Sequence, residues 1–330
     1  MKMLAQKSRW LLAGCLVGGL MIPLSLPAHA DGEDALDAVA RIAPEVFEEV
    51  APLNDTQVTD GELLVSTDSA EARVPLNSGD QIRITDSGKE LKITLPFDEK
   101  RVGGQREPGE PVQFDNGNGT STIPVVKDDG SVQITTVIEN AASPQSFRYD
   151  LELPPGFSMR PDISGSVAFV DSQGNVAGGV AAPWARDSKG QSVPTTYEVS
   201  GSALTQVVQH QDNQDITYPV VADPWLGIPL ISQVWVTGNT SSWIVNVVPT
   251  SWGRQYNAVY THFAHVDELR TRLNNNGTGW ALNYTIEQQF LCHVQGTLAE
   301  PGTYNLESWR VGMAWATQLN TLFQCNPPRA

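Results

Sequence analysis

The chain has 330 residues, of which 21 are basic and 37 are acidic, and its formal net charge is −16. A chain this acidic repels other polyanions, so nucleic acid and anionic surfaces are poor partners. The length is typical of about two domains.

The first thirty residues have the organisation of a secretory signal peptide. Lys2, Lys7 and Arg9 form a basic start, an uncharged apolar run covers residues 11–26, and residues 28–30 read Ala-His-Ala, a small-residue cleavage site. We therefore expect cleavage after Ala30, a secreted or extracellular mature chain, and no transmembrane segment after cleavage.

Residues 12–15 offer an alternative, because Leu-Ala-Gly-Cys is typical of a bacterial lipoprotein signal with Cys15 as the lipidated residue. The sequence favours the first interpretation. The apolar stretch before Cys15 is short, and the chain stays apolar well beyond it, where a lipoprotein tether would turn polar.

Removal of the signal peptide changes both the charge and the cysteine count. Its three basic residues leave 18 basic against 37 acidic, a net charge of −19, and the loss of Cys15 leaves Cys292 and Cys325. An even number of cysteines in a secreted chain predicts a disulfide between Cys292 and Cys325, the alternative being two free buried thiols.

The composition shifts near Pro224. Residues 225–330 contain five acidic and five basic residues, no lysine, and seven of the nine tryptophans. We therefore expect a signal peptide at 1–30, a helix and linker at 31–59, an acidic β-rich domain at 60–224, and a tryptophan-rich module at 225–330.

The acidic half begins with apolar spacings of three and four between residues 34 and 50, which predict an amphipathic helix that Pro44 kinks or splits. We expect it to pack on the β domain or to form a mobile arm. Short alternating runs with Gly/Asp turns follow, with hairpins expected at 123–138, 167–180 and 197–208. This pattern predicts an antiparallel β-sandwich-like domain.

The tryptophan-rich half mixes strands and helices. Strands are expected at 234–236 and 243–248, then a helix whose apolar stripe runs from Tyr256 to Leu273. A second helix is expected to begin at Thr285, as the cap of a capping box with Gln288. The overall prediction is a mainly β fold with α+β, closed by a small disulfide-bonded α+β module.

Four short stretches of this half resemble a known family. They are Pro-Thr-Ser-Trp-Gly-Arg at 249–254, Gln-Phe-Leu-Cys-His at 289–293, Asn-Leu-Glu-Ser-Trp-Arg at 305–310 and Cys-Asn-Pro at 325–327. Together they resemble a secreted actinobacterial family with domain of unknown function 2599. Residues 181–224 are similar to a leader that precedes various modules in actinobacterial secreted proteins. The resemblance implies export and a domain layout, and it implies no activity.

The sequence contains no strong catalytic, nucleotide or metal signature. His262 and His265 lie three apart on the first helix of the module, but a metal site needs convergent side chains. On a helical wheel His265 turns away from the apolar stripe, so we expect a partly buried and a solvated histidine. We expect no metal ligands and no cofactor.

One polar group could still support chemistry. A carboxylate beside an imidazole, Glu307 and His293, is the minimum for general acid–base catalysis, and Arg310 could hold an anionic substrate. The favoured alternative is structural: Glu307 and Arg310 form an ion pair, and His293 is its hydrogen-bond partner.

The sequence therefore predicts a non-catalytic exported recognition or cell-envelope-associated module. Its tryptophans suit binding of cell-wall glycan or of another exported protein, with Arg254 and Trp309 as candidate ligand-binding residues. The alternative is an envelope hydrolase using His293 and Glu307.

Overall fold

The computed structural model describes residues 34–330, apart from 54–57, 68–69, 87, 100, 163–164, 175, 212–214, 228, 256, 258 and 297–301. The predicted signal peptide, its cleavage after Ala30 and the alternative lipidation at Cys15 lie outside the described residues. Among the residues that are described, no helix is both long enough and apolar enough to cross a membrane.

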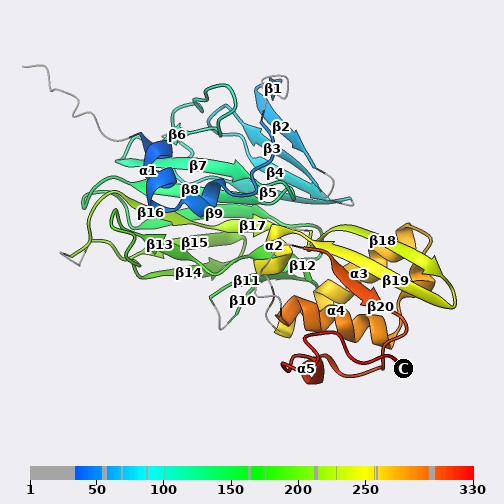
Figure 1. Cartoon of the computed structure of the whole chain (residues 1–330). Coiled ribbons are helices and arrows are strands. Elements are labelled where there is room, and N and C mark those ends of the chain that lie inside the picture. The colour runs from blue at the N-terminus through cyan, green and yellow to red at the C-terminus, as the bar shows by residue number, and fades with distance from the viewer. Residues whose placement is uncertain are drawn as a thin grey trace, which may run out of the picture. The chain divides into compact units, whose positions relative to one another are not determined.

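Two large antiparallel sheets confirm the predicted mainly β fold (Figure 1). The first has the order β1-β2-β3-β4-β5-β9-β15-β14. Its strands are β1 (Val58–Thr59), β2 (Glu62–Ser66), β3 (Glu71–Pro75), β4 (Ile82–Asp86), β5 (Lys89–Thr94), β9 (Ser146–Glu152), β14 (Thr195–Ser200) and β15 (Ala203–Val208).

The second sheet has the order β10-β11-β12-β17-β8-β16-β13; in addition, β7 pairs with β8 and β6 pairs with β7. Its strands are β6 (Phe114–Asp115), β7 (Thr120–Val126), β8 (Val132–Ile138), β10 (Ser158–Pro161), β11 (Val167–Val170), β12 (Val176–Val180), β13 (Trp184–Arg186), β16 (Val220–Asp223) and β17 (Trp225–Gly227). The strand that starts at Trp225 thus pairs within this sheet.

The two sheets pack face to face as a sandwich. One apolar cluster takes buried side chains from both, such as Ile84 and Tyr149 from the first sheet and Ile134 and Phe169 from the second. Along β9 the residues alternate between buried and exposed, as expected for a strand with one face in water. The three predicted hairpins are present as β7–β8, β11–β12 and β14–β15.

The N-terminal segment covers the outer face of the second sheet. Helix α1 (Ala35–Ile42) ends just before Pro44, which begins the 3-10 helix η1 (Pro44–Phe47), as the proline position predicts. Their apolar residues pack on Ile123, Val125 and Val137. Strands β7 and β8 are therefore buried on both faces, which explains why all their residues are buried.

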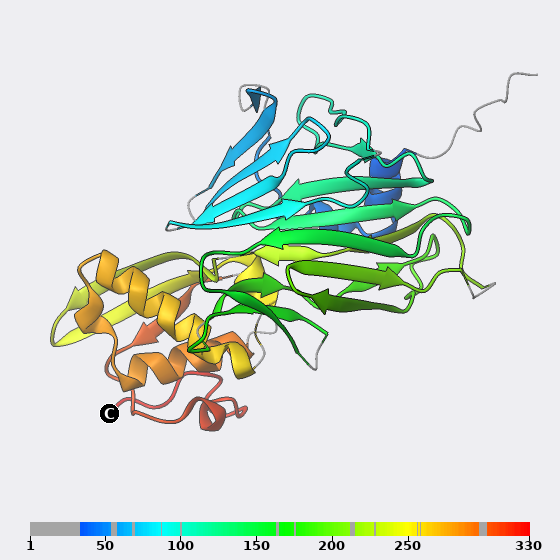
Figure 2. The ribbon, with the colours of Figure 1, turned by 180° about the vertical axis from the view of Figure 1, so that it is seen from behind.

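The remaining chain forms a smaller α+β module. Its sheet has the order β18-β19-β20, and helices α3 and α4 cover one face of it (Figure 2). The elements are β18 (Ile231–Asn239), β19 (Ser242–Pro249), α2 (Ser251–Gln255), η3 (Val259–Thr261), α3 (His262–Asn275), η4 (Gly279–Ala281), α4 (Tyr284–Gly296), β20 (Tyr304–Glu307) and α5 (Trp315–Gln318).

Two details of the predicted helices are wrong. Helix α3 begins at His262, and its buried face includes both His262 and His265, whereas Phe263 is 53% exposed. The sequence predicts one helix with an apolar stripe from Tyr256 to Leu273. The 3-10 helix η3 interrupts it, so the helical periodicity starts again at His262 and a different face is buried. Helix α4 is capped by Asn283, whose side chain accepts from the backbone N–H of Ile286, so Thr285 is not the cap.

Candidate functional site

The predicted ion pair between Glu307 and Arg310 is present at the end of β20. Arg310 also donates through Nη1 to the carbonyl of Pro327, 2.9 Å away. The backbone N–H and C=O of Glu307, at the edge of the sheet, are bonded by the buried side chain of Gln289. These contacts hold the strand, helix α4 and the C-terminal tail together.

His293 lies on the opposite side of this sheet. Its ring stacks on Tyr304, with ring centroids 5.0 Å apart, and burial lowers its pKa to about 4. Tyr304 and Leu306 point toward the helices, and because side chains alternate along a strand, Asn305 and Glu307 point to the other face. The structure therefore places Glu307 with Arg310 and does not bring it together with His293.

Trp309 contacts the last two residues of the chain. The guanidinium of Arg329 is 5.7 Å from the centre of its ring, and its carbonyl accepts from the backbone N–H of Ala330. The indole is only partly accessible. As a candidate ligand-binding residue it is therefore covered on one side by the tail.

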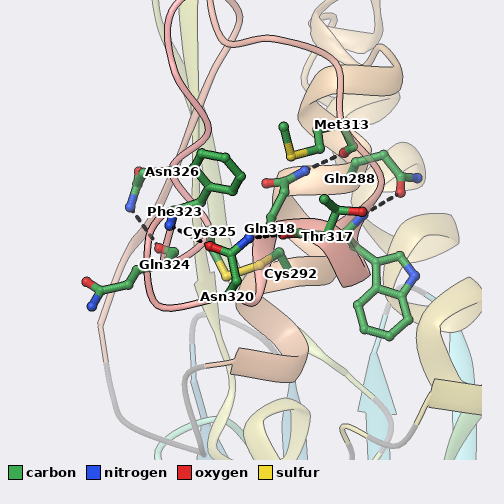
Figure 3. Close-up of a disulfide and its surroundings, with 11 residues drawn as sticks. Gln288, Cys292, Met313, Thr317, Gln318, Asn320, Phe323, Gln324, Cys325 and Asn326 are labelled. Atoms are coloured by element: carbon green, nitrogen blue, oxygen red, sulfur yellow. Dashed lines mark hydrogen bonds between the residues drawn. A yellow bond between two sulfur atoms is a disulfide. The ribbon is translucent and has the colours of Figure 1, made fainter.

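The predicted disulfide between Cys292 and Cys325 is confirmed, and it joins α4 to the C-terminal tail (Figure 3). The tail is held further by Gln288, whose side-chain oxygen accepts from the N–H of Trp315, and by Gln318, whose carbonyl accepts from the N–H of Cys325. The chain-entropy model gives about 3.8 kcal/mol for a crosslink that closes a loop of this length.

Arg254, the other candidate ligand-binding residue, is 8% exposed and joins the module to the N-terminal segment. Its Nη2 lies 2.6 and 2.7 Å from the two carboxylate oxygens of Glu49, and its Nη1 donates to the carbonyl of Pro249. This interaction is strong because both partners are charged, although one nitrogen contacts both carboxylate oxygens.

The turn between β7 and β8 adds a second connection to the module. Asp129 accepts from the N–H of Ser131 and, through its other oxygen, from the N–H of Trp252 at the start of α2. Lys127 is buried and donates to the carbonyls of Val46 and Glu48, and burial lowers its pKa to about 8.

Trp252 is the apolar anchor of this contact. Its side chain is fully buried among residues of β11 and α3, and a Cβ atom on Gly227 would come within 2.5 Å of its ring. A glycine in β17 is therefore required for the indole to pack against the second sheet.

A cavity of about 540 Å³ opens beside these contacts, between the sandwich and the module. We call it the interface cavity. Its lining combines carboxylates, hydroxyls and one arginine: Glu49, Pro52, Ser66, Thr67, Asp128, Asp129, Ser232, Gln233, Val248, Pro249, Thr250, Arg254, Gly302 and Thr303. Partial burial, and then the neighbouring carboxylates of Asp129 and Glu49, raise the pKa of Asp128.

The cavity continues into the face of the small sheet that the helices leave uncovered. We call this face the sheet platform, and its residues are Gln233, Trp235, Thr237, Ile244, Asn246, Val248, Asn305 and Glu307. Across the strands Trp235 is paired with Asn246, and Asn246 with Asn305. The indole of Trp235 is 41% exposed, and Gln233 and Asn305 are exposed on the same face, whereas Asn246 is 7% exposed and its amide donates to the carbonyl of Trp235.

The sequence interpretation missed this surface. The signal was present as alternation in β18, where Gln233, Trp235 and Thr237 occupy odd positions and valines the even positions. Within the described part of the chain, no group of three or more acidic, histidine or cysteine side chains could hold a metal ion.

Comparisons with known proteins give one family match, which covers the module. No curated protein sequence matches the chain. A glycoside hydrolase family 81 structure from Clostridium thermocellum is similar over 62% of this chain and 30% of that one, at 7% identity and a TM-score of 0.20, which is too low to support an argument. Residues 231–328 match the family model described as Protein of unknown function (DUF2599).

Proposed function

We propose that the protein is a non-catalytic, exported recognition protein that binds cell-wall glycan on its sheet platform. The observation that supports this most is the exposed indole of Trp235 on the same face as the exposed amides of Gln233 and Asn305. Sugar rings offer apolar C–H faces that pack on an indole, and their hydroxyls pair with amide donors and acceptors.

The adjoining cavity fits the same proposal. Its volume of about 540 Å³ lies within the usual range for small-molecule sites, and its lining is mostly polar. Export is supported by the basic, apolar and cleavage regions of the first thirty residues and by the disulfide.

The alternative of an envelope hydrolase using His293 and Glu307 has less support. General acid–base catalysis needs both groups within reach of one substrate. Here the imidazole stacks on Tyr304 on the helix-covered face, whereas the carboxylate pairs with Arg310 at the other.

The test is binding of the mature chain to purified bacterial cell-wall glycan, measured by pull-down and titration. Trp235→Ala should weaken binding about tenfold, because it removes the stacking surface. Trp280→Ala is the matched control: this indole is 48% exposed but contacts Trp243, whose side chain packs on the helix side of the sheet. Equal binding by wild type and Trp235→Ala would contradict the proposal.

A further inference from the structure

The interface cavity closes one end of the sheet platform. Gln233 and Val248 form the cross-strand pair next to Trp235 and Asn246, and both line the cavity. Two residues along a strand span about 7 Å, so a ligand stacked on Trp235 reaches the cavity in one short step. Beyond this pair the lining includes Pro52 and Ser66, which lie outside the module, together with module residues such as Thr303. An extended chain lying along β18 therefore meets residues from outside the module at this end.

The carboxylates that line the cavity differ in their hydrogen-bond and ion-pair partners. The guanidinium of Arg254 holds both oxygens of Glu49, and the two oxygens of Asp129 accept from backbone N–H groups. By contrast, the carboxylate of Asp128 makes no hydrogen bond or ion pair with any other described residue. It is exposed at the cavity wall and retains its full capacity to accept hydrogen bonds.

We propose that the interface cavity holds the terminal residue of a glycan chain, and that Asp128 is the specificity-determining acceptor of its hydroxyl groups. This inference rests on the proposed function. The non-reducing end of a glycan has one more free hydroxyl than an internal residue, in which that oxygen forms the glycosidic bond. A carboxylate with two free oxygens can accept from two neighbouring hydroxyls, and such charge-assisted bonds are strong.

The sandwich then takes part in recognition directly. Glu49, Ser66 and Asp128 belong to the N-terminal segment or the sandwich, whereas Gln233 and Thr303 belong to the module. The site is composite. The contacts of Arg254 and Trp252 hold its sandwich side and its module side together.

The test uses the full mature chain and size-fractionated glycan strands of bacterial cell walls, titrated by calorimetry. If chain ends are bound, the affinity per strand should stay constant once strands are long enough to cover Trp235. Asp128→Asn should weaken binding at least about tenfold. Glu48→Gln is the matched control, since it removes one charge from the segment beside the cavity without changing its lining.

The possible failures are distinguishable. Recognition of chain ends would be overturned if the affinity per strand rose steadily with strand length, or if Asp128→Asn bound as tightly as the wild type. In either case, weaker binding by Trp235→Ala would still support the proposed function. Strands that do not bind to the wild type would overturn both. The raised pKa of Asp128 means that its charged form is disfavoured in the folded chain, so Asp128→Asn should melt at or above the wild-type temperature, which separates lost binding from lost folding.

Discussion

At the scale of single residues, chemistry could be predicted better than position. The Glu307–Arg310 pair and the Cys292–Cys325 bond follow from residue types and spacing, and both are present. The burial of His265 could not be predicted, because the face it occupies depends on where α3 starts. That start is set by η3, a turn that leaves no periodic signal in the sequence.

Arg254 gives a prediction at this scale. Arg254→Ala should lower the free energy of unfolding by about 1–3 kcal/mol, because it removes a buried, paired charge and leaves Glu49 without that partner. Arg270→Ala is the control: its ion pair with Asp267 is nearly half exposed, and such pairs contribute about 0–1 kcal/mol. Urea unfolding of both variants measures the difference, and equal losses would contradict the structural role of Arg254.

At the scale of elements, the turn residues predicted which strands form hairpins, whereas the short strands left no comparable signal in the sequence. Each of the three hairpins was predicted from two alternating runs around a Gly-containing turn, as at Gly130, whose φ of 81° favours glycine. Strands β10 and β16 were missed, because each has only four residues without alternation of buried and exposed positions, and β16 pairs with the distant β8. The sheet platform belongs to this class, since its three strands come from two distant parts of the module.

The packing of α4 against β20 predicts a pH dependence. Burial against Tyr304 lowers the pKa of His293 to about 4, below its unfolded value near 6.5, so the unfolded chain binds more protons between these values. Stability from this group is full above about pH 6.5 and is lost as the pH falls toward 4. The loss amounts to about 3 kcal/mol.

Comparison with His293→Gln isolates this contribution, because other groups titrate in the same window. Burial lowers the pKa of His262 as well, whereas it raises that of Asp223 to about 7, which acts in the opposite direction. Between pH 7 and pH 4 the wild type should lose more stability than the variant, as measured by thermal unfolding across that range. Parallel curves would show that His293 is protonated equally in both states.

At the scale of the whole molecule, composition predicted two parts, and the described residues contain two large separate apolar cores. One lies inside the sandwich and the other between α3, α4 and the small sheet. The links between them include a small cluster around Trp252, the Arg254 and Asp129 contacts, and an ion pair between Arg272 and Asp86. These contacts join residues more than a hundred positions apart, and no local pattern in the sequence predicts them.

We propose on this basis that the module folds as a unit and is released by limited proteolysis. The resistant fragment should start near residue 231, because Trp225–Gly227 is hydrogen-bonded within the second sheet and should stay with the sandwich. Trp252→Ala should speed this release severalfold, since it removes the apolar anchor between the two cores and leaves a cavity there. Trp235→Ala should not, because that indole faces solvent on the platform. Mass spectrometry of timed digests identifies the fragment. Digestion without an intermediate, at equal rates in all three proteins, would mean that the cores unfold together.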